Sequence, residues 1–99
     1  SAFRVLDLDA PAEPPPPRRV RANREEHGIV LRWGTSPGVS RWRVRRSTQE
    51  NKQYKMLDDW VPESQYVDAN VMPGTTYVYK VVAVTYNGIS EPVEVIVDK

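Results

Sequence analysis

The sequence predicts an all-β domain built as a seven-stranded antiparallel sandwich, and three observations carry this prediction. Fifteen valines, five tyrosines and three tryptophans in 99 residues make a composition rich in strand formers. From Arg18 onward, apolar and polar residues alternate with a period of two, which is typical of half-buried strands. Turn signals recur about every ten residues, and no stretch keeps the helical period of 3.6. These patterns favour two packed sheets and no substantial helix.

The early strands show the alternation most clearly. Ile29, Leu31 and Trp33 share one side of a run, and Trp42 and Val44 share one side of the next. The breaks between runs contain glycine, proline, asparagine or serine, the residues that favour turns. The strands are therefore expected, in order, at about residues 18–23, 28–34, 40–47, 54–58, 65–69, 75–86 and 92–98.

The first 17 residues have a different character from the rest. Four consecutive prolines at 14–17 fix φ and lack amide donors, so this stretch is expected to run as a stiff polyproline II segment. The apolar and acidic residues before it are too few to bury themselves. The sequence therefore divides into residues 1–17, a Pro-rich linker or the end of a preceding domain, and residues 18–99, a folded domain.

The composition excludes several classes of site. The chain has no cysteine and one histidine, so disulfides, thiol nucleophiles and multi-histidine metal sites cannot form. His27 lies in a turn signal beside Glu25 and Glu26 and is expected to be an exposed loop residue. The adjacent carboxylates Asp58 and Asp59 point to opposite faces of a strand and do not converge for acid–base catalysis. The sequence predicts no enzyme activity, no metal site and no cofactor.

Several motifs follow one another in a characteristic order. Trp33 closes the strand GIVLRW, the strand RWRVRRS comes next, and the run QYVDANVMPGTTYVYKVVAVTYNGIS at 65–90 joins a Pro-Gly turn to a Tyr-x-Tyr-x-Val-x-Ala strand. Over about residues 14–98 this order of motifs resembles a fibronectin type III domain. In finer detail, the motifs are similar to those of modules in bacterial extracellular carbohydrate-active enzymes and phage tail proteins. The resemblance implies an immunoglobulin-like sandwich with Trp33 at the centre of its core. It also implies that Tyr77 is a tyrosine corner, whose hydroxyl bonds backward to the backbone.

Three arginines form the most prominent charged feature. Arg41, Arg43 and Arg45 are spaced by two, so they share one face of a strand, and Lys80 is expected on the same side of the neighbouring strand. Guanidinium groups in such a row suit a carboxylate, sulfate or phosphate partner, and the alternative is a solvated face without a ligand. Nucleic acid is not expected, because no exposed aromatic residues are interleaved with the arginines.

Two further tryptophans raise the question of sugar binding. Trp42 shares its strand face with Val44 and is expected in the core. Trp60 is expected to cover an open edge or end of the core, with an exposed platform for a pyranose ring as the alternative.

The last hairpin supplies a second candidate surface. Asn87-Gly88 is a two-residue type I′ signal between Tyr86 and Ile89, and it is expected at the same end of the sandwich as the TSPG loop at 35–38. Loops displayed by a rigid scaffold commonly carry recognition. The candidate interaction surface therefore comprises Arg41, Arg43, Arg45, Tyr86, Asn87 and Ile89.

These observations favour a non-catalytic spacer or protein-interaction module of a larger, extracellular or surface-exposed multidomain protein. The alternative is a carbohydrate-binding accessory domain of a polysaccharide-degrading enzyme. The expected partners are neighbouring domains of the same chain and another protein or a glycan, without nucleic acid or membrane insertion. By itself the domain is expected to be a monomer.

Overall fold

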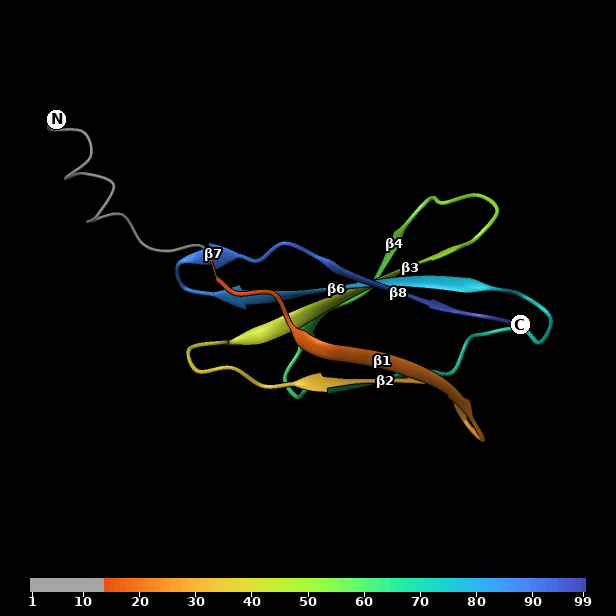
Figure 1. Ribbon diagram of the computed structural model, residues 1–99, viewed down its shortest axis with the longest axis horizontal. Coiled ribbons are helices and arrows are strands. Elements are labelled where there is room, and N and C mark those ends of the chain that lie inside the picture. Colours follow the sequence, from red (N-terminus) through yellow and green to blue (C-terminus); the bar gives the residue numbers. More distant parts are fainter. Residues whose placement is uncertain (1–13) are drawn as a thin grey trace, which may run out of the picture.

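The computed structural model describes residues 14–99, whose strands pair into two antiparallel sheets (Figure 1). The three-stranded sheet has the order β1-β2-β5, and the five-stranded sheet has the order β4-β3-β6-β7, with β8 also paired to β6. The described residues contain no helix, so the all-β sandwich is confirmed. The strands are β1 (Arg18–Glu25), β2 (Gly28–Gly34), β3 (Arg41–Thr48), β4 (Lys55–Val61), β5 (Gln65–Asp68), β6 (Tyr77–Thr85), β7 (Gly88–Ile89) and β8 (Val93–Val97).

The core forms where the inward sides of β2, β3 and β6 meet. Trp33 is 4% exposed and packs edge-on against Trp42, with 5.8 Å between ring centroids. Tyr79 and Val81 from β6 are fully buried in the same cluster. The residues that alternate inward in the sequence therefore fill the space between the sheets.

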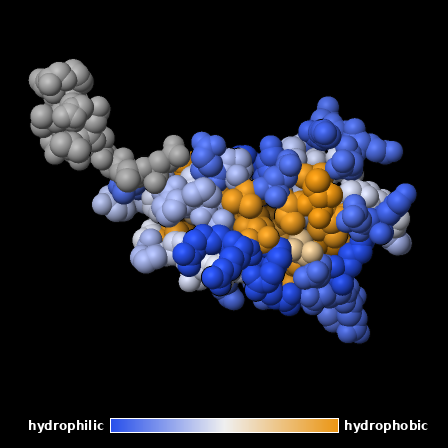
Figure 2. All heavy atoms as spheres, viewed as in Figure 1, coloured by the Kyte–Doolittle hydropathy of each residue, from blue (hydrophilic) through white to orange (hydrophobic). Residues whose placement is uncertain are grey.

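The edges of the core are closed by smaller side chains. Figure 2 shows hydrophobic side chains gathered along the line where β1 and β8 lie side by side, with hydrophilic ones around them. Val20, Ala22 and Val95 are partly buried against the core. The sandwich is thus bordered on this side by its first and last strands.

A short strand that the sequence did not predict, β7, lies between β6 and the expected last strand, which is β8. The Ala83 N–H donates to the Ser90 hydroxyl at 2.9 Å, and the Ser90 N–H donates to the Ala83 carbonyl at 2.9 Å. Val84 pairs with Ile89 and Val81 with Val93, so this side of the ladder holds one extra residue. Pro92 cannot donate to the ladder at this point, and a bulge results. The structure therefore has eight strands where the sequence predicted seven.

The turn between β6 and β7 also differs from the prediction. Thr85 pairs with Gly88, so the two loop residues are Tyr86 and Asn87 rather than Asn87 and Gly88. Gly88 has φ +134°, whereas neither Tyr86 nor Asn87 has positive φ. A type I′ turn needs positive φ at both central residues, so the expected turn type is wrong.

The end of the proline segment lies directly before β1. Residues 1–13 of the expected linker lie outside the described residues. Pro14 and Pro17 are buried, while Pro15 and Pro16 are exposed. Two of the four prolines therefore pack against other residues, and the expected domain boundary at residue 17 stays a prediction.

The described chain enters and leaves the sandwich at opposite ends. In Figure 1 it enters beside β7, runs into β1, and leaves after β8 at the other end of the long axis. The loop between β6 and β7 shares the entry end with the loop between β2 and β3, since the Ser40 N–H donates to the Val84 carbonyl at 2.8 Å. That common end was expected for these two loops.

Candidate interaction surface

The outward side of the five-stranded sheet carries the arginine row. Arg41, Arg43 and Arg45 of β3 lie opposite Val84, Val82 and Lys80 of β6. Their neighbours in the sequence, Trp42 and Val44, are buried on the inward side. We call this outward side, with Arg41, Arg43, Arg45, Lys80, Trp60 and Ile89, the arginine face.

Valines on the outward side of β6 are buried under these long side chains. Val82 and Val84, which lie opposite Arg43 and Arg41, are exposed by only 6% and 7%, although they point away from the core. Arg41 and Arg43 are themselves only half-buried. The aliphatic stems of arginine and lysine can cover apolar surface while their charged ends reach water, which accounts for this burial.

Trp60 lies on the arginine face and not over the core. Its side chain is 63% exposed, so the expectation that it covers an edge of the core is wrong. The Arg41 guanidinium lies 4.1 Å from the centroid of the Trp60 ring, a cation–π contact. The Arg41 Nε–H also donates to the Asp59 carbonyl at 3.1 Å, which holds the guanidinium near the ring.

The remaining charges of the face are partly paired. Arg43 Nε donates to the Asp59 carboxylate at 2.6 Å. Lys80 Nζ lies 4.3 Å from the centroid of the Tyr54 ring, and the Tyr54 hydroxyl donates to Glu94 at 3.0 Å. Arg45 is exposed, and no carboxylate within residues 14–99 forms a salt bridge with it.

The last hairpin joins the arginine face through one of its residues. Ile89 is 48% exposed and pairs with Val84, which in turn lies opposite Arg41. Directly paired residues share a face, so Ile89 extends the face towards the loop. Tyr86, exposed by 93%, and the exposed Asn87 form the loop tip beyond it.

A polar cluster between the sheets was not predicted. Arg46 Nη1 donates to the Asp68 carboxylate at 2.7 Å, and the Tyr79 hydroxyl donates to the same oxygen at 2.7 Å. The Asn70 N–H adds a third bond to Asp68 at 3.2 Å. The sequence did contain a signal for this cluster. Alternation along β3 places Arg46 on the inward side with Trp42 and Val44.

The pKa directions follow from this burial. Burial and the hydrogen bond to Asp68 raise the pKa of Tyr79 above its usual range. Burial is the largest effect on Arg46 and opposes its charged form, but the hydrogen bond to Asp68 and the negative charge of Asp68 together outweigh it, so the pKa of Arg46 is raised. Both groups therefore keep their protons, and the cluster acts as a fixed structural element.

A second set of contacts ties the loop before β6 to the end of the chain. The Tyr77 hydroxyl accepts a hydrogen bond from the Met72 N–H at 2.7 Å, the backward link expected of a tyrosine corner. Arg24 donates to the carbonyls of Met72, Thr75 and Asp98. The role of Arg24 was not predicted, because its three acceptors are backbone atoms that no side-chain motif reveals.

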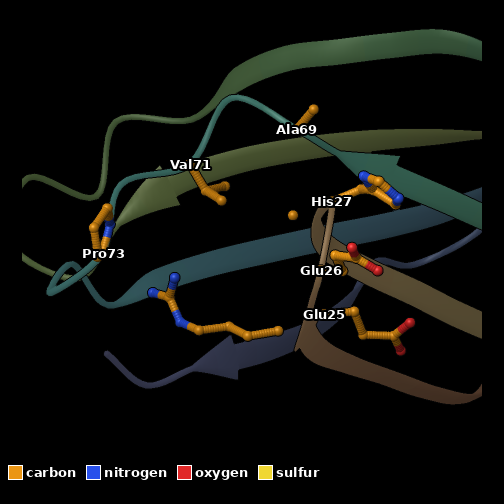
Figure 3. A pocket seen from close by; sticks show the side chains of 8 residues that line it. Glu25, Glu26, His27, Ala69, Val71 and Pro73 are labelled. Atoms are coloured by element: carbon orange, nitrogen blue, oxygen red, sulfur yellow. The ribbon is translucent and has the colours of Figure 1, made fainter.

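A hollow beside the first turn is lined by His27 and the two glutamates next to it. Figure 3 shows Glu25, Glu26 and His27 at the turn between β1 and β2, with Ala69, Val71 and Pro73 on the other side. His27 is exposed, and Glu25 is bonded to Arg32 at 2.8 Å, which lowers the pKa of Glu25. Among residues 14–99 no three histidine or acidic side chains are grouped to hold a metal ion.

Comparison with known proteins assigns the fold. A crystal structure of an Fn3-like protein from Clostridium thermocellum superposes with a TM-score of 0.75 and 28% identity, over 86% of this chain and 92% of that one. The chain has the fibronectin type III fold. No family model matches its sequence. The described part of the chain has no helix long and apolar enough to cross a membrane.

Two further similarities are to segments of longer proteins. Protein turtle homolog B of Rattus norvegicus is 32% identical over 82 residues, which cover 78% of this chain and about 6% of that protein. Pectate lyase PelI of Erwinia chrysanthemi, solved in complex with tetragalacturonic acid, matches with a TM-score of 0.62 and 25% identity. That match covers 76% of this chain and 27% of the lyase. Domains of this fold thus occur as modules of multidomain proteins.

Proposed function

We propose that this fibronectin type III domain is a non-catalytic spacer or protein-interaction module within a larger extracellular or surface-exposed protein. One observation carries the proposal: the chain enters at one end of a rigid sandwich and leaves at the other (Figure 1). A domain with this arrangement adds its own length between its neighbours. Nine residues of β6 at about 3.4 Å each give a rigid separation of about 30 Å.

Contacts at the exit support the spacer role. Arg24 binds the carbonyl of Asp98, the penultimate residue, and the carbonyls of Met72 and Thr75 in the preceding loop. The chain therefore leaves from a fixed point, which limits the directions open to a following domain. The non-catalytic role is supported by the bonding of Arg46, Asp68 and Tyr79 to one another.

A domain exchange in the parent protein tests the spacer role. Replacement by an unrelated sandwich of similar length, with its termini at opposite ends, should restore most of the parent's function. A matched sandwich with both termini at one end should fail, because it adds little distance. Equal failure of both replacements would contradict the spacer role. Protease accessibility of the domain on intact cells would test the extracellular setting.

A second candidate function is a carbohydrate-binding accessory domain. It is favoured by the 63% exposure of Trp60, whose ring could stack on a sugar, and by the match to a segment of a pectate lyase. Affinity electrophoresis in gels containing polygalacturonate tests it. Retardation that is lost in Trp60→Ala and kept in Tyr86→Ala would favour this candidate, whereas unretarded migration would favour the spacer role.

A further inference from the structure

We propose that the arginine face binds an extended acidic segment of a partner protein, with carboxylates at alternate positions of the segment. This inference concerns a surface, and it is independent of the spacer role, which depends on the two chain ends. Of the carboxylate, sulfate and phosphate groups that could pair with the arginine row, it selects carboxylates.

The clearest indication is a pair of like charges that the fold does not need. Arg45 and Lys80 lie directly opposite each other on paired strands. Like charges in this position destabilise the sheet, because their side chains project side by side from neighbouring strands and repel each other. Lys80 is balanced by the Tyr54 ring and by Glu94, which lies opposite it on β8. Arg45 is exposed and has no salt-bridge partner among residues 14–99.

The whole face keeps an excess of positive charge. Its cations are Arg41, Arg43, Arg45 and Lys80, and the carboxylates that contact them or lie opposite them belong to Asp59 and Glu94. Two positive charges therefore remain for a partner to neutralise. An anionic partner is attracted to such a field and is bound by charge-assisted hydrogen bonds.

Exposed apolar groups on the same face favour a protein as the anion. Met56, Trp60, Ile89 and Ile96 are exposed by 39%, 63%, 48% and 51%. Strand pairing puts Met56 beside Arg45, Ile89 beside Val84, and Ile96 beside Val78. Protein interfaces are enriched in tryptophan, methionine and arginine, which serve as anchors beside charged contacts. Apolar side chains of a partner could pack on these four residues.

The spacing of the arginines selects an extended segment. Residues two apart in a strand are separated by about 6.7 Å, so the three arginines form a row about 13 Å long. An extended peptide repeats its side chains on one side at the same interval. Aspartate or glutamate at every second position would therefore meet Arg41, Arg43 and Arg45 in turn, while the intervening side chains point elsewhere.

Synthetic peptides and charge-neutral variants test the proposal. The probe is a peptide of four Asp-Thr repeats, compared with a peptide of the same composition in which the four aspartates are contiguous. Binding is measured with the whole chain by NMR titration, following backbone amides and the indole of Trp60. The alternating peptide should bind more tightly, and the shifts should map to β3, β6 and Trp60. Arg45→Gln should weaken its binding about two- to fivefold, as expected for one exposed ion pair.

A matched control separates a specific face from general electrostatics. Arg21→Gln removes the same charge from β1 in the other sheet and should leave binding unchanged. Arg45→Gln should not lower the urea midpoint, since it relieves repulsion with Lys80. Equal weakening by both substitutions, or equal affinity for both peptides, would overturn the proposal. Tighter, Arg45-dependent binding of polygalacturonate than of the alternating peptide would overturn the assignment of a protein partner.

Discussion

The buried pair of Arg46 and Asp68 allows a sharp test of how the two sheets are held together. Arg46 comes from β3 of one sheet and Asp68 from the end of β5 in the other, and their side chains are exposed by 13% and 4%. Arg46→Met keeps a side chain of similar length and removes the charge. Asp68 is then left as a buried carboxylate without its cation.

The structure sets the expected size of the loss. Removing one partner of a buried ion pair typically costs about 3–5 kcal/mol, because the other charge stays buried and uncompensated. Asp68 keeps hydrogen bonds from the Tyr79 hydroxyl and the Asn70 N–H, so we expect the lower end, about 3 kcal/mol. A domain of this size has an unfolding free energy of about 5–15 kcal/mol, so the variant should fold but unfold at markedly lower urea.

Urea unfolding followed by tryptophan fluorescence measures this effect, since Trp33 and Trp42 are buried in the core. The decisive comparison adds Asp68→Asn, which keeps an oxygen acceptor and removes the buried charge. The double variant should be more stable than the sum of the single losses predicts, with a coupling of about 2 kcal/mol. A loss below about 1 kcal/mol for Arg46→Met, or strictly additive losses, would refute the reasoning.

Four further predictions concern the core, the corner, the buried phenol and the loop. Trp33→Ala should remove about 3–5 kcal/mol, and an unchanged urea midpoint would contradict its place in the core. Tyr77→Phe leaves the Met72 N–H without its acceptor and should cost about 1 kcal/mol or somewhat more in the same assay. Because the pKa of Tyr79 is raised, the folded state keeps a proton that the unfolded chain loses above about pH 10. The unfolding free energy should therefore fall by up to about 1.4 kcal/mol per pH unit there, and Tyr79→Phe should flatten that fall relative to the native chain. Tyr86→Ala should change stability by less than about 0.5 kcal/mol while weakening binding to any partner of the loop; loss of folding would instead show that Tyr86 is a core residue.

The sequence by itself determined where seven of the strands lie along the chain and which residues form the central core. Alternation with a period of two is a property of each strand, so it could be recognised without knowing which strands are neighbours. Trp33, Leu31 and Tyr79 are buried for this reason. The row of Arg41, Arg43 and Arg45 on one face follows from the same local geometry.

Other features were decided only by the tertiary structure. The bond between Arg46 and Asp68 joins residues 22 positions apart, and it forms because two different sheets bring them together. The exposure of Trp60 depends on which side of β4 is turned outward, on the same side of the sheet as the arginine row. The separation of β7 from β8 depends on the Ser90 hydroxyl replacing a ladder partner of Ala83. Each of these depends on register between strands or on packing between sheets, whereas a period of two describes only one strand at a time.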